Sequence, residues 1–127
     1  MMASTARTAG RRVLVVEDEY LLANRMVREF AKLGVETVGP AGTIERALDL
    51  IQHCEHLDGA VLDIKVRGDM VFGLADVLRA RGVPFVYATG YDRPMIPDRY
   101  RGVARCQKPF DSAQAVRALF PDVGPIH

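Results

Sequence analysis

Three short runs of apolar residues, continuous rather than alternating with polar ones, constrain this fold more than any other feature of the sequence. They are Val13–Val16, Ala60–Leu62 and Phe85–Ala88. A strand that is buried on both faces needs apolar side chains on both sides, and parallel sheets covered by helices bury their strands in this way. The runs therefore predict the central strands of a parallel sheet in an α/β protein.

Segments with helical periodicity separate these runs. Apolar residues recur at helical spacing and predict helices at 20–33, from 44 to about 51, at 71–81 and from 112 to about 120. Thr43 and Asp111 are expected to be N-caps, and Gly34 and Gly82 to end the helices that precede them. Any helix between Tyr91 and Arg101 is expected to be short or displaced because this segment holds two prolines.

Two further strands complete the pattern. One is expected at 35–38, closed by Gly39-Pro40, and the other at 103–107. Five strand–helix units with short connections predict one doubly wound domain at 11–121. A disordered lead is expected at 1–10 and a tail at 122–127.

The composition of the chain limits the number of domains and the kinds of partner to expect. A chain of 127 residues, 49% of them hydrophobic, can bury the core of one domain. Lys+Arg 17 against Asp+Glu 16 leaves a net charge of +1, which predicts neither a nucleic-acid partner nor a membrane partner. No apolar stretch reaches the ~20 residues of a membrane span. Cys54 and Cys106 are expected to be reduced thiols in a cytoplasmic protein.

Charged and hydroxyl side chains follow the expected strands where each strand ends. Glu17 and Asp18 follow the first run, Asp63 follows the second, Thr89 follows the third, and Lys108 follows the last strand. Ligands of doubly wound sheets bind outside the carboxyl ends of the strands. We therefore expect these five side chains to share one pocket.

Three carboxylates in one pocket need a cation. Two unit charges about 4 Å apart repel by roughly 4 kcal/mol at an effective dielectric near 20. Mg²⁺ suits oxygen ligands of this kind, and the lack of His or Cys at the strand ends argues against zinc. With the metal on Glu17 and Asp18, Asp63 is left as a nucleophile that can form an acyl phosphate. Thr89 and Lys108 would bind the phosphoryl group.

These five elements, together with Lys108-Pro109-Phe110, resemble the receiver domain of bacterial two-component response regulators over about residues 11–120. The segment 84–91 also resembles the signature of the FAT GUY receiver subfamily. The resemblance implies a flavodoxin-like sheet of order 2-1-3-4-5. It also implies that a sensor histidine kinase or a histidine phosphotransfer protein phosphorylates Asp63, and that the backbone carbonyl of Lys65 helps to hold Mg²⁺.

The resemblance further implies a stand-alone response regulator that signals through an unknown protein partner or acts as a phosphate sink. Such a protein catalyses only its own phosphorylation and dephosphorylation. The sequence departs from the family at two places, and the first of them puts the usual switch in doubt. Arg105 stands three residues before the lysine, where most receivers have Tyr or Phe, and Tyr91 is a candidate substitute. Arg67-Gly68-Asp69 replaces a frequent Pro-Gly turn.

Other interpretations stay open. The chain could be a pseudo-receiver that binds a partner without phosphorylation. It could also be a small aspartyl-phosphate phosphatase, although Lys65 stands where such enzymes favour a second Asp. Glu17-Asp18 could simply cap the first helix. The cluster His53, Cys54 and His56 is expected to do no more than favour the helix dipole. Five arginines are expected to form a solvated or partner-facing surface: Arg79, Arg81, Arg99, Arg101 and Arg105.

Overall fold

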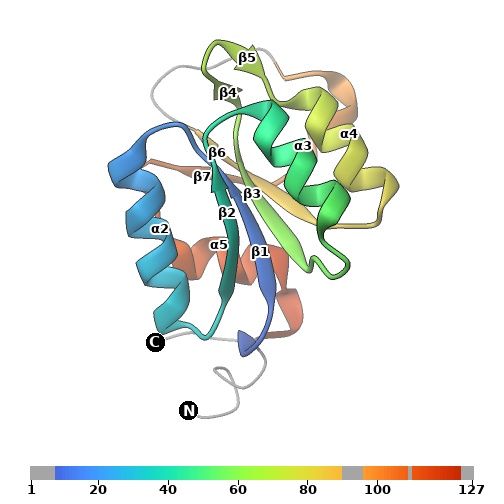
Figure 1. Cartoon of the computed structure of the whole chain (residues 1–127). Helices are drawn as coiled ribbons and strands as arrows, with labels where there is room; N and C mark the ends of the chain where they lie inside the picture. The colour runs from blue at the N-terminus through green and yellow to red at the C-terminus, as the bar shows by residue number, and fades with distance from the viewer. Residues whose placement is uncertain (1–7, 90–95, 109, 124–127) are drawn as a thin grey trace.

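A computed structural model describes residues 8–89, 96–108 and 110–123, and its centre is a five-stranded parallel sheet (Figure 1). The strands lie in the order β2-β1-β3-β6-β7, and each neighbouring pair is parallel. Their bounds are β1 Arg12–Val16, β2 Glu36–Ala41, β3 Gly59–Asp63, β6 Phe85–Thr89 and β7 Arg105–Gln107. Since β6 and β7 are the fourth and fifth strands of this sheet, the predicted flavodoxin-like order 2-1-3-4-5 is confirmed.

Helices cover both faces of the sheet. Helices α2 (Tyr20–Lys32) and α5 (Ser112–Leu119) lie on one face, and α3 (Ile44–His53) and α4 (Phe72–Ala80) lie on the other (Figure 1). Along β1, Val13 and Val15 belong to the core under α2 and α5, whereas the alternate residues Leu14 and Val16 belong to the core under α3 and α4. Both faces are buried, which explains why the apolar runs are continuous.

The predicted N-caps and terminal glycines of the helices agree with the structure. The Thr43 hydroxyl accepts a hydrogen bond from the Arg46 amide at 3.0 Å, and the Asp111 carboxylate accepts from two amides at the start of α5. Gly34 and Gly82 follow α2 and α4 with φ values of +79° and +72°. A side chain is disfavoured at such φ values, so glycine ends these helices at low cost.

The two edge strands differ from their predicted bounds by two residues or more at one end, whereas β1, β3 and β6 differ by at most one residue at an end. β2 does not close before Gly39-Pro40 but continues through this pair to Ala41. It lies at the edge of the sheet, where a proline without an N–H group removes no ladder hydrogen bond. β7 begins at Arg105 rather than at Val103, because only 105–107 pair with β6.

A two-stranded hairpin that the sequence analysis did not predict follows β3. Strands β4 (Lys65–Val66) and β5 (Asp69–Met70) are antiparallel, and Arg67 and Gly68 form the turn between them. In Figure 1 the hairpin lies at the edge of the sheet where β1 and β3 end. It therefore borders the expected pocket.

The fourth unit has no α-helix in its described part, in line with the prediction. A single 3₁₀ turn, η1 (Asp98–Tyr100), precedes β7, and a second one, η2 (Pro121–Val123), follows α5. The Tyr100 ring is fully buried and packs on Tyr87 at a centroid distance of 6.3 Å and on Phe72 at 6.1 Å. This ring fills part of the space on the α4 side of β6.

The last residues of the predicted N-terminal lead lie against α2. Thr8 is buried and its hydroxyl donates a hydrogen bond to the Leu33 carbonyl. The Gly10 amide donates to the Gly34 carbonyl at 3.0 Å. The contacts of the domain thus extend at least to Thr8, three residues before the predicted boundary at Arg11.

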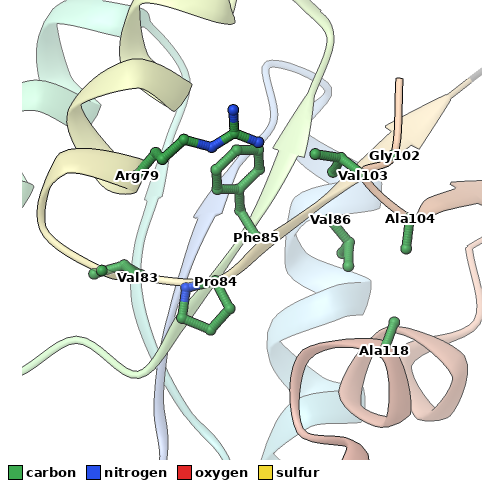
Figure 2. A pocket seen from close by; sticks show the side chains of 10 residues that line it. Arg79, Val83, Pro84, Phe85, Val86, Gly102, Val103, Ala104 and Ala118 are labelled. Atoms are coloured by element: carbon green, nitrogen blue, oxygen red, sulfur yellow. The ribbon is translucent and has the colours of Figure 1, made fainter. Parts of the chain in front are cut away.

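A pocket of about 670 Å³ lies where β6 starts, at the opposite edge of the sheet from the acidic residues (Figure 2). Phe85 at the start of β6, Val103 before β7, Arg79 of α4 and Ala118 of α5 line it. Because Asp63 and Thr89 end their strands while Phe85 begins β6, this pocket is separate from the site described next.

Candidate functional site

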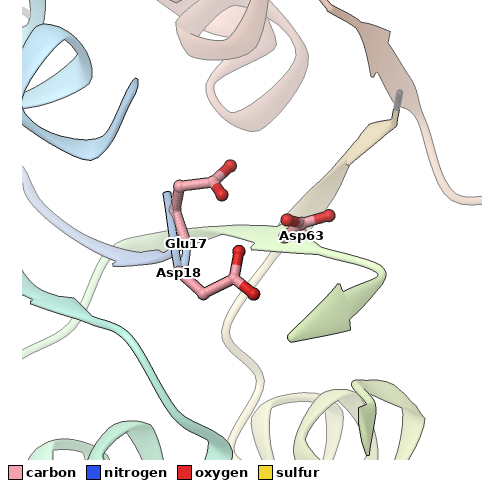
Figure 3. A group of neighbouring side chains, drawn as sticks. All are labelled: Glu17, Asp18 and Asp63. Atoms are coloured by element: carbon pink, nitrogen blue, oxygen red, sulfur yellow. The ribbon is translucent and has the colours of Figure 1, made fainter. Parts of the chain in front are cut away.

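Three carboxyl groups meet where β1 and β3 end. The two strands are neighbours, with Val16 paired to Leu62, so Glu17 and Asp18 leave the sheet beside Asp63. One oxygen from each of the three carboxylates lies within 4.8 Å of the others. Figure 3 shows the three side chains gathered at this edge. Glu17 is buried, Asp63 is half-buried and Asp18 is exposed.

Lys108 balances part of this negative charge. Its Nζ lies 3.1 Å from Glu17 Oε1 and 3.4 Å from Asp63 Oδ2. The Lys108 amide also donates to the Thr89 carbonyl at 2.8 Å, which fixes the residue after β7 to the end of β6. One ammonium group thus lies close to two carboxylates from different strand ends, Glu17 after β1 and Asp63 at the end of β3.

Burial changes the acidity of the cluster. Burial and, less strongly, the Asp63 charge raise the pKa of Glu17 to about 7, against the hydrogen bond from the Glu19 amide and the charge of Lys108. Burial also raises the pKa of Asp63, against the opposing pull of Lys108. Burial alone would lower the pKa of Lys108, but Glu17 and Asp63 outweigh it and raise this pKa. The pocket therefore carries more negative charge than its surroundings stabilise.

Backbone amides orient two of the acids. Glu17 Oε2 accepts from the Glu19 amide at 3.0 Å. Asp18 Oδ2 accepts from the Arg67 amide at 2.9 Å, across 49 positions of sequence. Neither acid caps α2, because the N-cap residue of this helix is Glu19 and its side chain makes no cap hydrogen bond. The helix-cap interpretation of Glu17-Asp18 is therefore wrong.

The other predicted site residues lie around these acids or outside the described chain. Thr89 ends β6 and is paired with Gln107, next to Lys108. Lys65 begins β4, two residues after Asp63. Arg105 is exposed on β7 and paired with Tyr87 of β6, whose ring is fully buried. Tyr91 lies outside the described residues.

Sequence reasoning missed one contributor to this site and one buried aromatic residue that packs on β6. The Arg67 amide holds Asp18, and Gly68 beside it was the only signal of a tight turn. Tyr100 was not singled out, although it is fully buried, and its hydroxyl donates to Asp76. Arg99 pairs with the same carboxylate at 3.1 Å.

Over the described ranges, the triad Glu17, Asp18 and Asp63 is the one cluster of potential metal ligands. The residues at the end of α3 have other contacts: His53 lies 3.3 Å from an Asp49 carboxylate oxygen, and His56 lies 3.0 Å from Asp58. Glu17 Oε1 is buried and, in the same ranges, lacks a hydrogen-bond partner, although it is near the Lys108 charge. A buried carboxylate oxygen in a set of three hard ligands fits Mg²⁺.

None of the helices in the described ranges is both long and apolar enough to span a membrane.

No protein-family model matches the chain. Among curated proteins, the transcriptional regulatory protein PdtaR of Mycobacterium tuberculosis is 28% identical over 113 residues. The match covers 86% of this chain and 55% of PdtaR, so the chain spans about half the length of the curated relatives that it matches.

Solved structures cover the chain more fully. SdrG from Sphingomonas melonis Fr1 is 34% identical with a TM-score of 0.76, over 86% of this chain and 95% of that one. A BeF3-activated conformation of SdrG is 33% identical with a TM-score of 0.71, over 94% and 98% of the two chains. A response regulator receiver protein from Sinorhizobium medicae WSM419 shares the fold, at 22% identity, a TM-score of 0.72 and coverage of 89% and 94%.

The strand order, the acidic triad and the match over nearly all of SdrG agree with one another. The chain therefore belongs to the response regulator receiver domains of two-component signalling.

Proposed function

We propose that this protein accepts a phosphoryl group on Asp63 from a phosphohistidine of a sensor histidine kinase or a histidine phosphotransfer protein. The observation that carries the proposal is the geometry of Asp63, which shares Lys108 with Glu17 and lies in one cluster with Asp18. An acid beside an ammonium group and two further carboxylates is suited to nucleophilic attack on a phosphoryl group.

Each residue has a separate task in this proposal. Glu17, Asp18, Asp63 and the backbone carbonyl of Lys65 would hold Mg²⁺, which supplies positive charge to the phosphoryl oxygens when it is bound. Asp63 attacks the phosphorus, so that an acyl-phosphate O–P bond forms while the P–N bond to the donor histidine breaks and its imidazole leaves. Lys108 neutralises charge on the transferred group, and Thr89 donates its hydroxyl to it.

Phosphorylation would then signal by changing a protein contact, or it would drain phosphate from a donor. A phosphoryl group adds charge that biases nearby loops. Support for a stand-alone regulator comes from SdrG, which the chain covers over 95% of its length. SdrG also has a BeF3-activated conformation, and we propose a corresponding activation for this chain. The segment 84–91 supports membership of the FAT GUY subfamily, with Tyr91 or Arg105 taking part in the switch.

The test is incubation with acetyl phosphate and Mg²⁺, followed by intact-mass measurement. Wild type should gain one acid-labile phosphoryl group, and chelation of Mg²⁺ should prevent this. Asp63→Asn should gain none, while Asp69→Asn in the exposed hairpin should be labelled like wild type. Equal labelling of Asp63→Asn and wild type, or no labelling of either, would reject the proposal. Unlabelled protein that still binds a partner would instead indicate a pseudo-receiver.

A further inference from the structure

The side chain of Asp18 is held from the β4–β5 hairpin. In the described part of the chain, the only hydrogen bond to this carboxylate comes from the Arg67 amide, at 2.9 Å to Oδ2. Asp18 is exposed and lies in the loop between β1 and α2. An exposed side chain without this contact would sample several rotamers, and ordering it would oppose ligand binding.

The hairpin turn has the backbone geometry of a strained site. It contains only Arg67 and Gly68, with φ values of +49° and +85°, as a two-residue turn of type I′ requires. Glycine adopts such values freely, whereas arginine does so at a cost. Strain of this kind persists where neighbouring contacts stabilise it, and it often marks a functional site.

Two contacts of Arg67 offset that cost, one from the backbone and one from the side chain. The amide donates to Asp18, and Nε donates to the Gly42 carbonyl at 3.2 Å, in the loop between β2 and α3. The hairpin thus joins the loops that follow β1 and β2. Its first strand also carries Lys65, which is paired with Met70.

We infer that the Arg67–Gly68 turn positions Asp18 for the divalent cation, with the Arg67 amide as the positioning group. The amide occupies Oδ2 and leaves Oδ1 of Asp18 available to a metal ion. The turn thereby organises the pocket before the cation enters. This inference rests on the proposed function, because it takes the acidic triad to be the Mg²⁺ site.

The first test is calorimetric titration of folded variants with Mg²⁺ at pH 8. Arg67→Gly keeps the amide and accepts the positive φ, so its Kd should stay within about twofold of wild type. Arg67→Pro has no amide and cannot adopt this φ, so its Kd should rise about tenfold. Gly68→Ala strains the turn without a steric clash, because no atom lies within 4 Å of the added Cβ. Its Kd should rise about fivefold, and Gly68→Asn should restore much of the affinity.

A second measurement does not depend on the metal. In metal-free protein, hydrogen exchange followed by NMR should show a protected Arg67 amide, and Asp18→Ala should remove that protection. In the Asp18→Ala background, Gly68→Ala should change the exchange rate of the Arg67 amide no further, because the two changes act through one contact.

The outcomes distinguish the proposed Mg²⁺ site from the proposed positioning role of the Arg67–Gly68 turn. If wild type does not bind Mg²⁺, or if Asp18→Ala binds it as tightly as wild type, the proposed metal site is wrong. If Asp18→Ala loses binding while folded Arg67→Pro and Gly68→Ala bind like wild type, the site stands and the positioning role of the turn is overturned. An Arg67 amide that exchanges equally fast in wild type and Asp18→Ala also overturns it.

Discussion

Glu17 is the most deeply buried of the three acids, with a side chain only 1% exposed against 15% for Asp63. Burial raises its pKa to about 7, so near neutral pH the folded protein binds a proton there that the unfolded chain releases. A site that favours a proton on an acid also favours a cation in its place. Burial of negative charge therefore explains both the raised pKa of Glu17 and the expected binding of Mg²⁺.

The first prediction concerns the pH dependence of stability in metal-free protein. Because the folded pKa of Glu17 exceeds the ordinary value of 4.5, its contribution is complete below about pH 4.5 and is lost as pH rises through 7. Relative to wild type, Glu17→Gln should therefore gain up to about 3 kcal/mol in the free energy of unfolding between pH 4.5 and pH 8. Urea unfolding in EDTA measures this difference.

The matched control is Glu19→Gln, an exposed acid two residues along the chain. Its difference from wild type should stay nearly constant over the same pH range. A Glu17→Gln difference that does not change with pH would contradict the raised pKa.

At the scale of elements, η1 takes the place of a longer helix before β7. Tyr100 is buried, and the guanidinium groups of Arg79 and Arg99 lie over its ring at 4.3 Å and 4.9 Å from the ring centroid. Hydrogen bonds from Arg99 and Tyr100 hold the pKa of Asp76 in α4 below its usual value. The η1 segment is therefore fixed to α4 by an aromatic ring with polar contacts at its rim.

The second prediction tests whether the aromatic ring of Tyr100 or its hydroxyl contributes more to the free energy of unfolding. Tyr100→Ala should lower the free energy of unfolding by about 3–5 kcal/mol, because it leaves a cavity among Phe72, Phe85 and Tyr87. Tyr100→Phe keeps the packing and should cost only about 1 kcal/mol. Denaturant unfolding measures both, and equal losses in the two variants would contradict the packing role.

The first turn of α2 borders the acidic site and exposes two apolar side chains. Tyr20 is 75% exposed and Leu21 is 77% exposed, directly after the loop that carries Glu17 and Asp18. If Asp63 accepts phosphate as proposed, a protein donor must bring its phosphohistidine to Asp63, and we expect it to contact this turn, whereas a small donor would not.

The third prediction follows from this difference between donors. The double variant Tyr20→Ser, Leu21→Ser should accept phosphate from its protein donor at least about tenfold more slowly, since loss of two apolar contacts weakens the complex. Labelling by acetyl phosphate should be unchanged. Leu48→Ser, which removes an exposed apolar residue of α3, is the matched control. Equal rates for all three proteins with the protein donor would exclude α2 as a contact surface.

At the scale of the whole molecule, the sheet and the acidic cluster were predictable for the same reason. Runs such as Val13–Val16 are apolar throughout because both faces of the sheet are covered, and parallel strands end at one edge. The sequence alone therefore predicts that the polar residues after these runs lie near one another. The geometry of Glu17, Asp18, Asp63 and Lys108 follows from strand order.

What the sequence analysis missed depends on contacts that have no periodic pattern. The strands β4 and β5 have two residues each, too few for alternation to be visible. Pro40 suggested the end of a strand, but edge position lets β2 continue to Ala41. Burial of Tyr100 depends on α4 and β6, which are distant in sequence. Tertiary packing decides all three cases.

The fourth prediction concerns the stability of the domain with Mg²⁺ at the proposed site. Mg²⁺ at 100 times its Kd should add about 2.7 kcal/mol to the free energy of unfolding at pH 8. NaCl at matched ionic strength should add much less, because screening only weakens the repulsion between carboxylates. Asp18→Asn should lose most of the Mg²⁺ effect. An equal gain from the two salts in thermal unfolding would contradict a specific site.

The most direct measurement identifies the residue that carries the phosphoryl group. Protein treated with acetyl phosphate and Mg²⁺ is reduced with borohydride, which converts an acyl phosphate to an alcohol, and its peptides are then sequenced by mass spectrometry. We predict the reduced residue at position 63 alone, dependent on Mg²⁺. Reduction at Asp18 or Glu17 instead would contradict the proposed phosphorylation site, and labelling at Asp63 that persists without a divalent cation would contradict the proposed requirement for Mg²⁺.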